Sequence, residues 1–194
     1  MKTKFYVLAI LTVFFFASCK NDKQEAVKET KKAAVTQTES TEHQGQASVV
    51  DSVSAANALQ VAKSLPDFST LVTAINAAGV EDAVVNAGPL TIFAPLNSAF
   101  DKLPEGTVAT LLKPENKAKL AFILVNHVAP ANYPIKQLKK EAKKGRKLYM
   151  ASGKYLVVEN KGGDIYVGGT KILKSVKVSN GWIHVIDDVL VPAE

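Results

Sequence analysis

The chain has 194 residues, of which 47% are hydrophobic and 22% are charged. This composition is ordinary for a protein with one folded domain, and it argues against a disordered, a collagen-like or a polytopic membrane chain. The formal net charge of +6 is too small for a dedicated nucleic-acid-binding protein, so we expect no nucleic-acid partner.

The N-terminus has the pattern of a secretory signal. Lys2 and Lys4 precede an apolar run from Phe5 to Phe16, and two small residues follow. The run is shorter than the roughly 20 residues that a membrane-spanning helix needs. We therefore interpret residues 1–18 as a signal peptide, which predicts an exported protein.

Cys19 directly follows this signal and is the only cysteine of the chain. The segment resembles a bacterial lipoprotein signal, in which a cysteine at this place is cleaved at and lipidated. The resemblance implies that Cys19 anchors the protein to the bacterial cell envelope, at the outer membrane, with the domain facing the periplasm or the cell surface. The alternative is a free exported thiol, which would be open to oxidation or intermolecular pairing.

Residues 19–50 are predicted to be the lipidated cysteine and a flexible tether. From Lys20 onward the composition changes to charged, amide, hydroxyl and small side chains, with no aromatic residue. Such a segment cannot bury enough apolar surface to fold. The folded domain is therefore expected at residues 51–194.

Helices are predicted mostly in the N-terminal half of the domain. Ala55–Leu65 is predicted to be one helix, and Phe68, Leu71, Val72 and Ile75 form the stripe of a second. After an apolar strand at 90–94, an asparagine at position 97 is expected to cap a short turn at 98–102. A further helix is predicted to begin at residue 114 and to carry an apolar stripe that ends at residue 127.

The C-terminal third reads as short strands separated by glycine-containing turns. The predicted strands are 147–151, 154–159, 165–167, 171–178 and 182–190. Asn180-Gly181 suits a type I′ hairpin turn. Helices first and short antiparallel strands later indicate an α+β fold.

Three segments resemble the signatures of the fasciclin adhesion domain family. They are Thr91–Phe100 (TIFAPLNSAF) with Leu103-Pro104, Phe122–Val128 (FILVNHV), and Asn180–Pro192 (NGWIHVIDDVLVP). The resemblance implies a wedge-shaped β-sandwich flanked by helices, used for adhesion and extracellular binding without catalysis. In the central motif, Asn126 and His127, an asparagine stands where the family commonly has a tyrosine.

The residues themselves offer little support for an enzyme. The sequence has no nucleophile elbow, phosphate-binding loop, dinucleotide fingerprint or His-Glu-x-x-His motif. His184 and Asp187 are three apart on a predicted strand, which places them on opposite faces and weakens a chelating pair. We therefore predict no catalytic residues, metal or cofactor, and we interpret His127 as a buried structural residue.

The segment from Lys136 to Lys147 holds seven basic residues and one acid in twelve positions. It is either a binding site for an anionic polysaccharide, lipopolysaccharide phosphates or an acidic membrane surface, or a solubilising loop. The candidate binding residues are Lys136, Lys139, Lys140, Lys143, Lys144, Arg146 and Lys147.

These observations support two functional hypotheses. The first is a lipid-anchored binding module that supports cell adhesion or attachment to a matrix or surface polymer or protein. The second is an envelope carrier of an anionic glycan or a soluble ligand, without an adhesive role. The sequence leaves the oligomeric state open.

The anchor is tested by Cys19→Ser. Loss of the lipidation site is expected to move the protein from the membrane fraction to the soluble exported fraction, because diacyl attachment gives stable membrane residence. The measurement is the distribution of the protein between membrane and soluble fractions. Persistence of the variant in the membrane after a high-salt wash, which removes electrostatic attachment, would contradict the lipid anchor.

Overall fold

The structure is a computed structural model that describes residues 56–85 and 88–192. The expected signal peptide, Cys19, the tether and the first residues of the expected domain lie outside these residues. Within the described part of the chain, no helix is long and apolar enough to cross a membrane.

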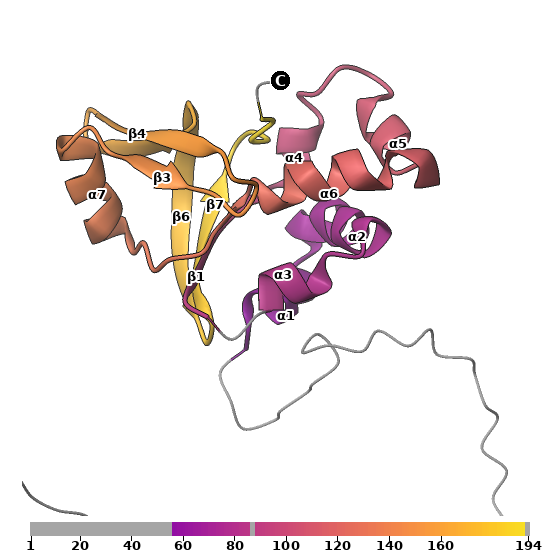
Figure 1. Ribbon diagram of the computed structural model, residues 1–194, viewed down its shortest axis with the longest axis horizontal. Coiled ribbons are helices and arrows are strands. Elements are labelled where there is room, and N and C mark those ends of the chain that lie inside the picture. The colour runs from indigo at the N-terminus through magenta and orange to yellow at the C-terminus, as the bar shows by residue number, and fades with distance from the viewer. Residues whose placement is uncertain (1–55, 86–87, 193–194) are drawn as a thin grey trace, which may run out of the picture. The chain divides into compact units, whose positions relative to one another are not determined.

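The described residues form an α+β fold (Figure 1), which confirms the predicted fold class. The helices are α1 (Ala58–Ser64), η2 (Pro66–Phe68), α2 (Ser69–Ala78), α3 (Glu81–Val85), α4 (Asn97–Phe100), α5 (Thr107–Leu111), η3 (Pro114–Asn116), α6 (Lys117–Val125) and α7 (Ile135–Lys143). The strands are β1 (Leu90–Pro95), β2 (Val128–Ala129), β3 (Lys147–Tyr149), β4 (Tyr155–Lys161), β5 (Asp164–Val167), β6 (Thr170–Val178) and β7 (Gly181–Ile186). The predicted strands are present, several with shifted ends, and α3, α5, α7 and β2 were not predicted.

The strands are hydrogen-bonded in the order β2-β1-β7-β6-β5-β4-β3. Their neighbours are antiparallel except for β1 and β7, which run parallel from Leu90 opposite Gly181 to Pro95 opposite Ile186. The expectation of antiparallel strands alone is wrong for this pair. A parallel pair needs a long crossover in place of a tight turn, and the chain between β1 and β7 supplies it.

The two central strands separate two apolar cores. On one face, Ile92 of β1 and Ile183 of β7 pack under α1, α2, α3 and α6. On the other face, Phe93 and Ile186 pack against α7 and the strands β3, β4 and β5, and we call this the second core. Figure 1 shows β3 and β4 lying across β6 and β7. Burial on both faces explains why β1 and β7 are nearly continuous apolar runs in the sequence.

Asn97 caps a helix, but a different one from the helix predicted. It is already the first residue of α4, whose N-cap position is Leu96, and its side chain makes no bond to its own helix end. Instead, the Asn97 side-chain oxygen accepts a hydrogen bond from the Thr70 N–H at 3.0 Å, and its amide donates to the Pro66 carbonyl. Asn97 therefore joins the start of α4 to the start of α2.

The hairpin between β6 and β7 also differs from the predicted Asn-Gly turn. Val178 pairs with Gly181, so the two turn residues are Ser179 and Asn180. The Asn180 side chain accepts from the Ala58 N–H at 3.1 Å and donates to the Val84 carbonyl at 2.9 Å. The asparagine therefore ties the hairpin to α1 and α3.

Gly181 is required by close packing of the backbone. Its φ is 144°, and a Cβ atom at this position would overlap the carbonyl oxygen of Leu90 on the parallel strand β1. A side chain here would force β1 and β7 apart at the first residue of their pairing.

Gly181→Ala is therefore expected to destabilise the protein by at least about 3 kcal/mol, the upper range for overpacked positions. Gly163→Ala is the matched control, because Gly163 has a φ of 97° with no atom near the added Cβ. The control is expected to cost about 1–2 kcal/mol from the backbone alone. The measurement is the free energy of unfolding in urea, and equal losses for the two variants would contradict the packing argument.

Candidate functional site

The basic segment forms a helix in the structure. Ile135–Lys143 is α7, and the chain enters β3 at Lys147, so most of the segment is not a loop. Its secondary structure fits a binding site and a solubilising surface equally. The helix was missed because its apolar stripe is short: Ile135, Leu138 and Ala142 pack on the second core, and lysines occupy most positions between them.

All seven candidate binding residues are exposed. We call them the basic face; it comprises Lys136, Lys139, Lys140, Lys143, Lys144, Arg146 and Lys147. Neighbours three or four apart lie on the same side of a helix, so the α7 lysines crowd like charges together. Such crowding destabilises an isolated helix, and an anionic partner would relieve it.

The buried side chains of Leu138 and Glu141 attach α7 to the rest of the domain. Leu138 is fully buried in the second core, and Glu141 is buried beside it. Gln137 donates a hydrogen bond to Glu141, and Arg146 forms an ion pair with it at 3.7 Å. Arg146 is therefore partly committed to holding α7, whereas the ammonium groups of the lysines of the basic face make no hydrogen bond or ion pair within the described residues.

The basic face includes an open groove of about 520 Å³. It is lined by Lys139, Lys140, Ala142 and Lys143 of α7 together with Asn160 of β4. A groove that combines ammonium groups with an amide can bind an anionic group and donate hydrogen bonds to it.

The central motif lies in the interior and is hydrogen-bonded to residues 187–192, which follow β7 and which we call the C-terminal segment. We call this pair of contacts the clamp. The Asn126 amide donates to the carbonyl of Leu190 at 2.9 Å, and the N–H of Leu190 donates to His127 Nε2 at 2.9 Å. His127 Nδ1 donates in turn to the Ile123 carbonyl, and Asn126 accepts from Ser152. Every side-chain nitrogen and oxygen of the two residues is thus hydrogen-bonded within the fold, and both side chains are buried.

Burial and the hydrogen bond that Nε2 accepts from the Leu190 N–H keep His127 neutral. Desolvation lowers the pKa of His127 to about 4, although its bond to the Ile123 carbonyl acts in the opposite direction. A proton on Nε2 would also face the Leu190 N–H. Burial likewise lowers the pKa of His184, whose ring is held by Ser175 and Tyr133.

His184 and Asp187 do not form a chelating pair. Both His184 ring nitrogens are hydrogen-bonded in the interior, whereas Asp187 accepts from the Lys171 N–H and pairs with Lys102. Within residues 56–85 and 88–192, no group of three or more His, Cys, Asp or Glu side chains is placed to hold a metal ion.

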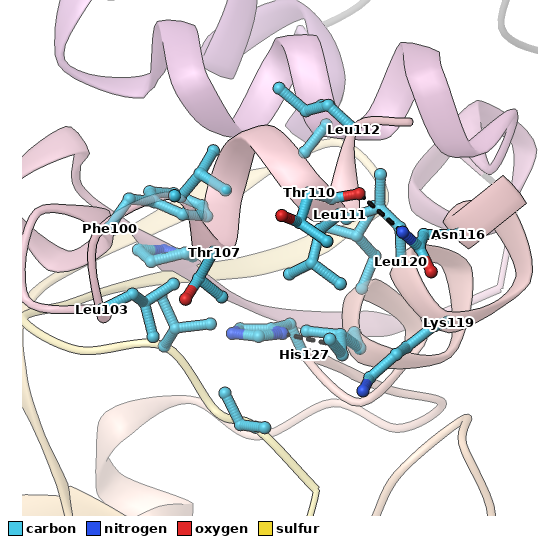
Figure 2. Close-up of a pocket in the computed structure, with 18 of the residues that line it drawn as sticks. Phe100, Leu103, Thr107, Thr110, Leu111, Leu112, Asn116, Lys119, Leu120 and His127 are labelled. Atoms are coloured by element: carbon cyan, nitrogen blue, oxygen red, sulfur yellow. Dashed lines mark hydrogen bonds between the residues drawn. The ribbon is translucent and has the colours of Figure 1, made fainter. Parts of the chain in front are cut away.

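A cavity of about 410 Å³ lies beneath α5, and the sequence analysis did not predict it. Figure 2 shows Phe100, Leu103 and Thr107 at one side of it, Lys119 at the other, and the His127 ring between them. It was missed because its walls come from α5, α6 and the C-terminal segment, and each contributes apolar residues that look like ordinary core.

Comparison with known proteins identifies the family. The model of the fasciclin domain matches residues 66–192. The chain belongs to the fasciclin domain family. The fasciclin domain therefore covers nearly all of the described residues.

Relatives of this fasciclin domain occur in bacteria and animals. Protein sll1483 of Synechocystis sp. is 40% identical over 160 residues, which cover 82% of this chain and 86% of that protein. Human periostin is 28% identical over 130 residues, 65% of this chain but 15% of periostin. Among solved structures, a FAS1 domain pair of the insect cell adhesion molecule Fasciclin I matches with a TM-score of 0.62 at 23% identity; the match covers 70% of this chain and about half (51%) of that chain.

The three fasciclin signatures meet in the structure. β1 of the first signature pairs with β7 of the last, and the Phe93 N–H donates to the carbonyl of His127 in the central motif. His127 then accepts from Leu190 of the last signature. The signatures are therefore residues that hold the fold together.

The neutral His127 predicts that stability falls in acid. Its pKa is about 4 in the folded state and about 6.5 when unfolded, so the unfolded chain binds the extra proton between these values. The contribution is complete above about pH 6.5 and is lost as the pH falls to about 4, by about 3 kcal/mol.

The measurement is the free energy of unfolding in urea from pH 7.5 to 4. His127→Gln keeps one donor and one acceptor but does not titrate, so its stability should fall less steeply over this range, whatever its value at pH 7.5. An unchanged pH dependence in the variant would contradict the assignment, because His184 is present in both proteins.

Proposed function

We propose that this protein is an exported, lipid-anchored fasciclin module that attaches the cell to an anionic surface or matrix polymer, and that the basic face is its contact surface. The module acts by binding and has no catalytic role. The observation that carries the proposal is the row of exposed lysines on α7, whose ammonium groups have no partner among residues 56–85 and 88–192.

Family membership supports the adhesive part of the proposal. A structural relative is described as an insect cell adhesion molecule. The binding role proposed for the single domain of this protein rests on that analogy of fold. The predicted signal peptide and the predicted lipid at Cys19 would place the domain outside the cytoplasm, at the end of the predicted tether.

The chemistry of the basic face favours a flexible polyanion. Lysine ammonium groups act as hydrated point charges with rotatable donors, and they do not form the two-pronged contact of arginine. Such groups suit carboxylates or sulfates spaced along a polysaccharide, where each contact is weak and several act together. The absence of aromatic residues between the lysines of Lys136–Lys147 argues against base stacking with a nucleic acid.

The main alternative is an envelope carrier with no adhesive role. Protease treatment of intact cells separates the two, because a periplasmic carrier would be spared and a surface adhesin would be cleaved. Deletion of the gene should then reduce attachment or biofilm mass. Unchanged attachment by the deletion strain, with the protein shown at the surface of the parent, would contradict the adhesive role.

Charge reversal on α7 tests the contact surface. The variant changes Lys139, Lys140, Lys143 and Lys144 to Glu and is expected to elute from an immobilised anionic polysaccharide at much lower salt. Each lysine near an anionic surface contributes about 1 kcal/mol. The fold should persist with a modest loss, since Glu is as good a helix former as Lys and costs some tenths of a kcal/mol near a helix C-terminus.

A second variant carries the same charge change elsewhere. It reverses four exposed lysines outside the basic face, namely Lys63, Lys113, Lys117 and Lys177. Both variants have the same net charge, so a difference in elution reports position alone. Thermal melting confirms that each is folded, and identical elution of the two variants would contradict the basic face as the binding surface.

A further inference from the structure

The cavity beneath α5 carries an inference that goes beyond the adhesive role. We propose that it binds an anionic single-chain amphiphile, such as a free fatty acid, with the hydrocarbon chain inside and the carboxylate at Lys119. The site is independent of the basic face, because none of the seven residues of that face lines the cavity.

The walls of the cavity are apolar. Aliphatic side chains come from α5, α6 and the C-terminal segment, and the volume of about 410 Å³ lies in the range of small-molecule sites. The walls include Val108, Leu111, Leu120, Ile123, Leu124 and Val189.

The ring nitrogens of His127 and the amide of Asn116, which line the cavity, already have hydrogen-bond partners. His127 uses Nδ1 for the Ile123 carbonyl and Nε2 for the Leu190 N–H. Asn116 donates its amide to the Thr110 carbonyl at 2.7 Å, as the dashed line in Figure 2 shows. Apart from the hydroxyls of Thr107 and Thr110, the lining offers few partners to polar groups of a ligand. An unpaired polar group is buried at a cost, so the site favours hydrocarbon in the buried part of the ligand.

The rim carries the charge that selects one end of the ligand. Lys119 is exposed and lines the cavity, and its ammonium group makes no ion pair or hydrogen bond within the described part of the chain. Glu105, also exposed, lines the cavity from the loop before α5. Without Lys2 and Lys4 of the predicted signal peptide, the net charge of +6 becomes +4. This positive charge favours an anion over a cation at the rim, which assigns the charged end of the ligand to Lys119.

The cover of the cavity can admit a chain. α5 has five residues and none of them is buried. It begins after Gly106, which has a φ of 78° and no atom near an added Cβ. A short helix that buries little apolar surface opens at low free-energy cost, so α5 offers a route of entry.

Calorimetric titration of the purified protein with alkyl carboxylates tests the site. Below the micelle concentration, binding should tighten by about fourfold for each added methylene from octanoate to dodecanoate, as burial of a methylene predicts. Dodecyltrimethylammonium, with the opposite head charge, should bind more weakly than dodecanoate. Failure of all the carboxylates to bind, or tighter binding of the ammonium compound, would overturn the proposal.

Three variants locate the binding. Leu111→Trp fills the cavity from α5 and should abolish dodecanoate binding; Thr107→Phe serves the same purpose if the first variant does not melt cooperatively. Lys119→Gln should weaken the binding of dodecanoate by about two- to fivefold at low salt, which is the range for an exposed ion pair. The same variant should bind dodecanol as tightly as the wild type does. Lys117→Gln is the matched control, because Lys117 lies on the same helix outside the cavity.

Full dodecanoate binding by the filled and folded variant would overturn the location, and equal effects of the two lysine variants would overturn the role of Lys119. Sedimentation with phosphatidylglycerol vesicles distinguishes a free amphiphile from a membrane lipid. The Leu111→Trp variant should bind vesicles as the wild type does. A loss of vesicle binding in that variant would show that the cavity takes a membrane lipid, which contradicts the proposal of a free amphiphile. A failure of this proposal leaves the polyanion experiment on α7 unaffected, because the two use different residues and different ligands.

Discussion

The parallel pairing of β1 with β7 is the contact on which the rest of the domain depends. Both strands are buried on both faces, so each supplies side chains to both of the apolar cores. Their backbones approach so closely at Leu90 and Gly181 that a Cβ atom cannot be accommodated. The clamp of Asn126 and His127 on Leu190 then fixes the chain just after β7. The fold is thus organised from its interior outward.

That arrangement explains which features the sequence could predict. Strands such as β6 and helices such as α2 were predictable, because each shows its own period of apolar residues and ends at a glycine or a turn. The family signatures were recognisable because they contain the buried central strands. Local patterns could not reveal that β1 and β7 are parallel, since the partner of a strand is decided by packing between distant segments.

The same limit applies to the side chains of the candidate sites. Asn97 looked like the cap of its own helix, yet its side chain reaches α2, because Leu96 takes the N-cap position. The exposure of the basic face follows from its lysines and was predictable, whereas the helix beneath them depends on Leu138 and the buried Glu141. The cavity was not predictable at all, because a void among Leu and Val side chains leaves no mark on the pattern of apolar residues.

The position of β7 in the sheet also has a consequence for the order of assembly. β7 is the last strand in the chain but lies between β1 and β6, so residues 90–95 find their partner only when residues 181–186 are available. Until then β1 has an open edge and both cores lack a wall, and such long-range pairings form slowly. The domain therefore cannot complete either of its two cores until residues 181–186 have been synthesised, however early its helices form.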